Sequence, residues 1–100
     1  MPEMISKYPG SGYKKEYHSA RSIVELERKL NKRFSYVNIS LGLLMLYQTD
    51  NEDSPVNLIY EGNRYFGQVY FIRVTKHKII DISEDDQSII DEVIIPSDMD

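Results

Sequence analysis

The second half of the chain consists of short runs of β-branched and aromatic residues separated by turn signals, and this pattern limits the folds open to it. Strands are predicted at residues 56–60 and 65–74, joined by a hairpin turn at Glu61-Gly62-Asn63. Two further strands are expected at residues 78–82 and 89–95. Because short turns join neighbouring strands in opposite directions, the sequence predicts an antiparallel meander.

An amphipathic helix is predicted ahead of these strands. Its apolar residues recur at three- and four-residue spacing, and they are Ile23, Leu26, Leu30 and Phe34. Ser19 is the favoured N-cap, with Ser22 and Glu25 as an alternative capping box. Basic residues gather in the last turn, where cations offset the negative end of the helix dipole. We expect the apolar stripe to pack against a sheet that contains residues 65–74.

Residues 36–48 fit two interpretations. Apolar residues alternate from Val37 to Tyr47 as in a strand, whereas residues 43–46 form a continuous leucine-rich run. We favour a buried second helix, although Gly42 would cost about 1 kcal/mol relative to Ala inside it. The expected fold class is therefore α+β, with one or two N-terminal helices packed on a three- to four-stranded antiparallel sheet.

The domain organisation follows from length. The chain has 100 residues, which suits one hydrophobic core. Residues 1–18 contain the turn-rich segment Pro9-Gly10-Ser11-Gly12 without a hydrophobic period, and they are predicted to form a flexible N-terminal arm. Residues 19–100 are predicted to form a single α+β domain.

Composition excludes several classes of protein. Apolar residues make up 41% and charged residues 28%, as in a globular protein. The absence of cysteine excludes disulfides, thiolate metal sites and a thiol nucleophile. The first residues do not resemble a secretory signal, and the longest apolar run, residues 41–47, is too short to cross a bilayer. We therefore expect a cytoplasmic protein without a membrane segment.

The charge is distributed unevenly along the chain, whose formal net charge is −4. Residues 1–33 carry eight Lys or Arg against four Asp or Glu, a sum of +4. Residues 79–100 carry no Lys or Arg and eight acids: Asp81, Glu84, Asp85, Asp86, Asp91, Glu92, Asp98 and Asp100. A surface of one sign steers association with a partner of the opposite sign, although such a surface also serves solubility.

No set of residues indicates catalysis or a bound cofactor. The two histidines, His18 and His77, are far apart in sequence, so a small nuclease that uses both is a third-ranked hypothesis. Residues 81–92 resemble a calcium loop in the spacing of their acids, but Asp86 stands where that loop requires Gly. We therefore expect a non-enzymatic protein without a metal or cofactor.

Recognition of another macromolecule is the remaining function. Tyrosine is enriched in interface cores, and this chain has eight tyrosines beside its acidic segment. The predicted partner-binding residues lie in the acidic turn expected between the last two strands, in the flank of that turn, and in the aromatic strand at 65–74: Glu84, Asp85, Asp86, Asp91, Glu92, Tyr65 and Tyr70. The alternative is a nucleic-acid-binding module that uses Lys7, Tyr8, Tyr13, Lys14, Lys15 and the basic end of the helix. The acidic net charge makes nucleic acid the less favoured partner.

The chain resembles a family in its overall build. An apolar stretch at residues 39–47, an acidic loop, an aromatic strand at 65–74 and the run Ile79-Ile80-Asp81-Ile82-Ser83 are similar to the small cytosolic immunity proteins of contact-dependent growth inhibition systems. The resemblance covers residues 20–95 and includes no diagnostic motif. It implies a protein that binds the toxic domain of a cognate effector, often a nuclease, and blocks its active site. A phage-encoded inhibitor of a host nuclease would share these features.

Overall fold

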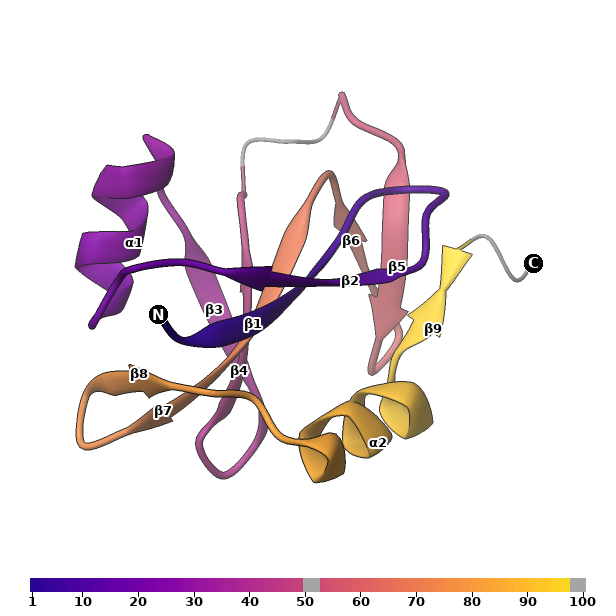
Figure 1. Cartoon of the computed structure of the whole chain (residues 1–100). Helices are drawn as coiled ribbons and strands as arrows, with labels where there is room; N and C mark the ends of the chain where they lie inside the picture. The colour runs from indigo at the N-terminus through magenta and orange to yellow at the C-terminus, as the bar shows by residue number, and fades with distance from the viewer. Residues whose placement is uncertain (50–52, 98–100) are drawn as a thin grey trace.

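The computed structural model describes residues 1–49 and 53–97, and within them the chain forms nine strands and two helices. The helices are α1 (Ile23–Leu30) and α2 (Glu84–Val93). The strands are β1 (Glu3–Lys7), β2 (Tyr13–Tyr17), β3 (Ser35–Ser40), β4 (Leu43–Tyr47), β5 (Val56–Tyr60), β6 (Asn63–Phe66), β7 (Val69–Thr75), β8 (Lys78–Ile80) and β9 (Ile95–Pro96). They build a six-stranded and a three-stranded antiparallel sheet (Figure 1). The predicted fold class is therefore wrong, because strands dominate and α1 follows a β-hairpin.

Strand β7 is the centre of the six-stranded sheet, whose order is β2-β1-β7-β4-β3. On one side β7 pairs with β4, and on the other its residues 69–71 pair with β1 while residues 73–75 pair with β8. Most residues of β7 are β-branched or aromatic, the types that suit a pleated, buried surface. The three-stranded sheet has the order β6-β5-β9.

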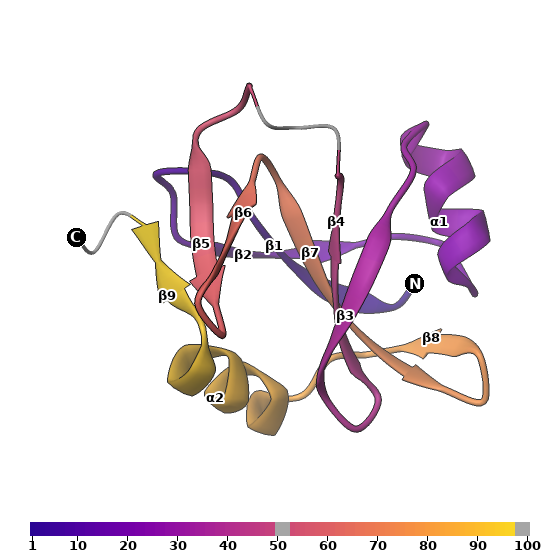
Figure 2. The same cartoon turned by 180° about the vertical axis from the view of Figure 1, so that it is seen from behind.

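The six-stranded sheet carries a hydrophobic core on each face. Leu44 packs on one face in a cluster with Leu26 of α1, and the next residue, Met45, points to the opposite face. That second face is covered by the three-stranded sheet and by α2, through residues such as Leu58 and Ile90. Seen from behind, α1 and the β5–β6–β9–α2 unit lie at opposite sides of the molecule (Figure 2).

The predicted helix at residues 36–48 is instead the β3–β4 hairpin. Successive residues of β4 point alternately to the two cores, as side chains of a strand do: Leu43 and Met45 to one, Leu44 and Leu46 to the other. Residues 43–46 read as a continuous apolar run because β4 is an interior strand that is buried on both faces. Gly42 occupies the turn with φ +79°, where a Cβ atom would lie 2.6 Å from Nη1 of Arg73.

The predicted flexible arm at residues 1–18 is also wrong. Residues 3–17 form the β1–β2 hairpin, and β1 pairs with β7 across 66 positions of sequence at Ile5 and Phe71. Met4 and Ile5 are completely buried, one in each core. The Pro9–Gly12 segment connects the two strands, with Gly10 at φ 77°.

The predicted last strand, residues 89–95, belongs mostly to α2, and only Ile95 and Pro96 form strand β9. Isoleucine favours strands, but here Ile90 packs on the core from the buried face of a helix. Ser83 caps α2 with a capping box: its hydroxyl accepts from the Asp86 N–H, and the Asp86 carboxylate accepts from the Ser83 N–H. This local signal outweighs strand propensity.

The other predicted strands are confirmed in part. Strand β5 has the predicted bounds, and β8 covers residues 78–80 of the predicted 78–82. The long strand predicted at residues 65–74 is divided into β6 and β7 at Gly67, where φ is 72°. The hairpin turn between β5 and β6 lies at Glu61 and Gly62, both with positive φ, as two-residue turns between twisted strands require.

Lys7 joins the two sheets through its fully buried side chain. Its Nζ donates to the Asn57 side-chain Oδ1 at 2.9 Å and to the Asn57 backbone oxygen at 3.2 Å. Asn57 in turn donates through Nδ2 to the backbone oxygens of Lys7 and Gly67. Hydrogen bonds of this kind compensate the desolvation of a buried cation and fix β1 against β5.

Helix α1 packs on the six-stranded sheet as predicted, with Leu26 buried in the cluster that includes Tyr70 and Ile72. Its N-cap is Ser22 and not the favoured Ser19, because the Ser22 hydroxyl accepts from the Glu25 N–H. Its C-cap is Asn31, which follows Leu30 and adopts the left-handed conformation with φ 52°.

We predict that Leu26→Ala lowers the free energy of unfolding by about 2 to 5 kcal/mol, because it leaves a cavity between α1 and the sheet. Val24 lies on the exposed side of the same helix, so Val24→Ala is the matched control and should change the free energy by less than about 0.5 kcal/mol. Urea unfolding followed by circular dichroism measures both. Equal effects of the two substitutions would contradict the packing described here.

Candidate functional site

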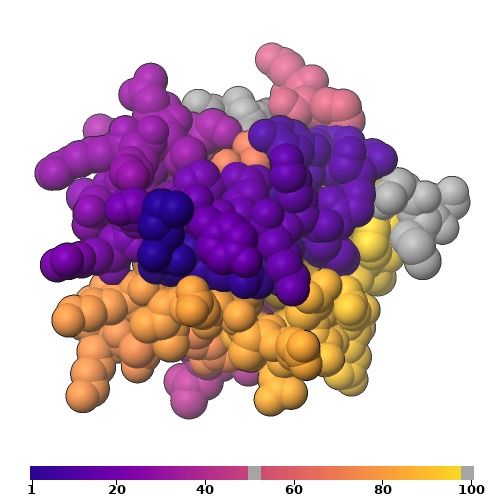
Figure 3. Space-filling view, viewed as in Figure 1, coloured from indigo at the N-terminus to yellow at the C-terminus, as the bar shows by residue number. Residues whose placement is uncertain are grey.

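The candidate site is the outer side of α2. Glu84, Asp85, Asp91 and Glu92 are all exposed, and their seven-residue spacing (84 to 91, 85 to 92) places them on one side of the helix. We call these four residues the acidic face. In Figure 3 the helix lies at the lower right, below the N-terminal hairpin. Glu84 and Asp85 were predicted to lie in a turn, and Asp91 and Glu92 in the strand after it. The structure places all four on a helix.

The helix dipole explains the acids at one end of the acidic face but not those at the other. Glu84 and Asp85 lie in the first turn of α2, where negative charge complements the helix dipole. Asp91 and Glu92 lie near the C-terminal end, where negative charge is unfavourable, and the last turn contains no basic residue. The C-terminal pair therefore has no stabilising role in the helix, which makes it the stronger indication of a binding function.

Apolar side chains lie next to the C-terminal acids in the chain. Val93 is 36% exposed and Ile95 is 54% exposed. Protein interfaces commonly combine a desolvated apolar centre with charged residues at the rim. The end of α2 and the start of β9 together supply both kinds of side chain.

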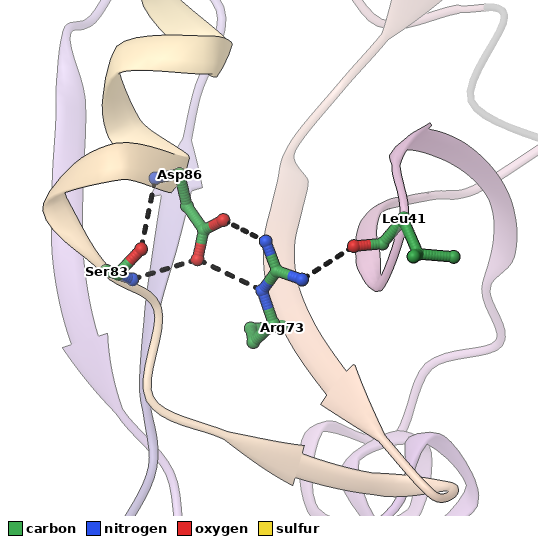
Figure 4. Close-up of polar contacts among 4 residues, drawn as sticks. All are labelled: Leu41, Arg73, Ser83 and Asp86. Atoms are coloured by element: carbon green, nitrogen blue, oxygen red, sulfur yellow. Dashed lines mark hydrogen bonds and ion pairs between the residues drawn. The ribbon is translucent and has the colours of Figure 1, made fainter.

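Asp86 does not belong to this surface, contrary to the prediction, because its side chain points inward. It is 1% exposed and accepts hydrogen bonds from the Arg73 guanidinium, one of them at 3.2 Å from Nε (Figure 4). Arg73 also donates through Nη1 to the backbone oxygen of Leu41 at 2.6 Å. Burial opposes ionisation of Asp86, but the hydrogen bonds from Arg73 and Ser83 outweigh it and hold the pKa of Asp86 below its usual range.

The two tyrosines predicted to bind a partner lie away from the acidic face. Tyr70 is 3% exposed in the core beneath α1, on the opposite face of the sheet from α2, and burial raises its pKa to about 12. Its ring packs edge-to-face on Phe34 at 5.6 Å. Tyr65 is partly buried on β6, where its ring packs on Tyr47 at 4.8 Å. Tyr70 is thus a core residue, and the structure does not join either tyrosine to the acids.

A polar cluster near Tyr70 contains residue types that are found in hydrolases. Glu16 Oε1 lies 2.9 Å from Nε2 of His18, and the Ser6 hydroxyl donates to Glu16 Oε2. Burial opposes ionisation of Glu16, but these hydrogen bonds keep its pKa below the usual range. In a nucleophilic triad the histidine contacts the serine. Here the carboxylate lies between them, so His18 is not placed to take a proton from Ser6.

The remaining predicted chemistry is not assembled in one place. His77 lies in the turn between β7 and β8, whereas His18 contacts Glu16 and the Tyr70 ring. The acids of the calcium-like stretch are divided among three places: Asp81 precedes α2 and accepts from the Glu3 N–H, Asp86 belongs to the capping box, and the others lie on the exposed side of α2. Over residues 1–49 and 53–97, no three His, Cys, Asp or Glu side chains come close enough together to hold a metal ion.

Two residues predicted to bind nucleic acid in the alternative function, Lys7 and Tyr13, point into the interior. Lys7 is 1% exposed. The Tyr13 ring packs against Phe71 at a centroid distance of 6.1 Å. Lys14 and Lys15 on β2 remain exposed, and Lys15 approaches Glu3 at 3.7 Å.

Comparisons with known proteins provide no assignment: the chain matches no family model, and no similar curated protein or solved structure was found. Neither helix in the described part of the chain is long and apolar enough to cross a membrane.

We predict that Asp86→Asn lowers the free energy of unfolding at neutral pH by roughly 2 to 4 kcal/mol, because it leaves Arg73 without its charged partner. A lowered folded-state pKa stabilises the fold above the unfolded-state pKa, and that contribution is lost as the pH falls through the folded-state value. The parent and the variant should therefore converge in acid. Urea unfolding over a pH series measures this.

Asp85→Asn is the matched control for that experiment, since Asp85 is the exposed neighbour of Asp86 on the same helix. It should stay within about 1 kcal/mol of the parent protein at every pH, because it loses only the favourable interaction of an exposed charge with the helix dipole. A constant difference in stability between Asp86→Asn and the parent from neutral to acidic pH would contradict the assigned role of the carboxylate charge.

Proposed function

We propose that this chain is a non-enzymatic inhibitor, of the immunity-protein type, which binds a cognate basic protein toxin and blocks its active-site cleft. The observation that carries the proposal is the acidic face of α2, and above all Asp91 and Glu92, which the helix itself does not need. Residues 20–95 also resemble the immunity proteins of contact-dependent growth inhibition systems, and that resemblance implies the same class of function.

The proposed mechanism is steric and electrostatic. A nuclease domain binds phosphates in a cationic cleft, and an acidic protein surface can occupy such a cleft in place of the nucleic acid. Opposite charges accelerate the encounter, and the rate decreases as salt screens them. Val93 and Ile95 would supply the apolar centre of the contact, with the acidic face at its rim.

The proposal includes a cytoplasmic site of action, because a nuclease toxin must be neutralised where its nucleic-acid substrate lies. It also includes a phage-encoded inhibitor of a host nuclease as a variant of the same function. Both variants use one binding surface and require no catalytic residue of this chain.

The direct test is to express the protein encoded by the neighbouring gene, first alone and then together with this chain. We expect the neighbour to arrest growth alone, to be neutralised by coexpression, and to copurify with this chain as a salt-sensitive complex. A neighbour that is harmless and forms no complex would count against the proposal.

We predict that Glu92→Lys weakens binding to the toxin about tenfold or more, with a slower association rate, because it places a cation against a cationic cleft. The melting temperature should be unchanged or slightly higher, since a lysine near the C-terminal end of α2 suits the helix dipole. Surface plasmon resonance at two salt concentrations, together with thermal melting, separates binding from folding.

The control is Asp53→Lys, which makes the same reversal of charge at an exposed turn residue outside the acidic face. It should leave both association and affinity close to those of the parent. Equal losses in both variants would show that net charge, and not the acidic face, determines binding.

The alternative function, nucleic-acid binding, is distinguished by direct titration. Micromolar binding to RNA or DNA at low salt, with a steep dependence on salt concentration, would favour the alternative. Because Lys7 and Tyr13 face the interior, that binding would have to use the exposed Tyr8, Lys14, Lys15 and the basic end of α1.

A further inference from the structure

A second surface lies on the side of the molecule away from α2. Helix α1 has only eight residues, and part of the sheet between its N-terminal end and the β7–β8 hairpin remains open. This opening is a groove of about 550 Å³. Its lining residues come from α1 with its N-cap and from β3, β4, β7 and β8 or their turns.

The floor and one wall of the groove are apolar. Leu44, Val74 and Ile79 belong to the core beneath α1 and reach the surface here. Val24 and Tyr36 stand beside them, each 58% exposed. Exposed apolar residues that gather in one concave place commonly mark a binding site.

The rim of the groove carries positive charge from Lys76. Lys76 and His77 line it, and no Asp or Glu is among the described residues that do so. Lys78 and Arg21 are exposed next to this rim, and the Ile79 N–H donates to the Arg21 backbone oxygen at 2.8 Å. The groove therefore complements apolar side chains that are accompanied by negative charge.

The turn that carries this rim has an unfavourable sequence for its conformation. Lys76 and His77 both adopt left-handed backbone angles, with φ 49° and 67°. Two-residue hairpin turns with positive φ at both positions strongly favour Asn-Gly, because side chains with a Cβ are strained there. Strained residues that persist at a rim indicate that their side chains serve a purpose other than stability.

We propose that the groove is the docking site for an acidic peptide segment of a partner protein, whose apolar side chains enter the groove while its carboxylates face Lys76 and His77. A second copy of this chain suits the groove less well, because a symmetric contact would bring two cationic rims together. An anionic membrane suits it less well too, since a concave opening behind a hairpin is poorly exposed to a flat surface.

The proposal is tested with a short synthetic peptide in which Asp and Glu alternate with Leu and Phe, and with a control peptide that has Lys in place of every acid. Amide shifts in ¹⁵N-labelled protein should be confined to residues 22–24, 36–38, 42–44 and 74–79. Fluorescence anisotropy should show binding of the acidic peptide that decreases with salt, and no comparable binding of the control peptide.

The decisive variant is Lys76→Asn with His77→Gly, which removes the rim side chains and also supplies the favoured turn sequence. We expect its melting temperature to be equal to or higher than that of the parent, and its affinity for the acidic peptide to fall about tenfold. Tyr36→Thr, which removes the apolar wall while keeping a strand-forming residue, should also weaken binding. Lys14→Gln removes an exposed cation outside the groove and should leave binding unchanged.

Three results would overturn the proposal. They are equal binding of the acidic and lysine peptides, concentration-dependent shifts at the groove without peptide, which would indicate self-association, and shifts produced only by anionic lipid vesicles. The charge reversal Glu92→Lys on α2 should not affect peptide binding at the groove, so this surface and the acidic face can fail independently.

Discussion

The position of α2, and with it the candidate site, depends on the ion pair between Arg73 and Asp86. Arg73 extends from the central strand β7 and contacts both the Asp86 carboxylate and the Leu41 backbone oxygen in the β3–β4 turn. Three segments that are separate in sequence are joined by one guanidinium group (Figure 4). Because the inward direction of Asp86 fixes the rotation of α2, it also determines which acids of the helix face solvent.

The sequence predicts those parts of the fold whose signals are local. The stripe of α1 and the strands β5 and β8 have clear periods or turns at their ends, and the structure contains them. The errors occur where tertiary pairing decides. The N-terminal hairpin has few apolar residues and becomes a strand pair only because β7 is beside it. Strand β4 shows no clear period because both of its faces are buried.

The candidate site could be predicted only in part for a related reason. Composition identifies the acidic segment, but not the direction of each carboxylate. The spacing of Ser83 and Asp86 is a capping-box signal that identifies both the start of α2 and the acid that turns back toward it. The predicted binding role of Tyr70 was wrong because the sequence does not show whether a tyrosine on a strand faces solvent or the core. The groove could not be predicted, since its residues come from segments between positions 22 and 79.

The pairing of β1 with β7 has a consequence for synthesis of the chain on the ribosome. The β1–β2 hairpin emerges well before strand β7, which pairs with β1 at Ile5 and ends only at Thr75. Met4 and Ile5 therefore lack their native neighbours on β7 until that strand has been translated, and contacts this distant in sequence slow folding. Lys14 and Lys15 on β2 help to keep the hairpin soluble before β7 is available, because charges on an edge strand oppose association with other chains.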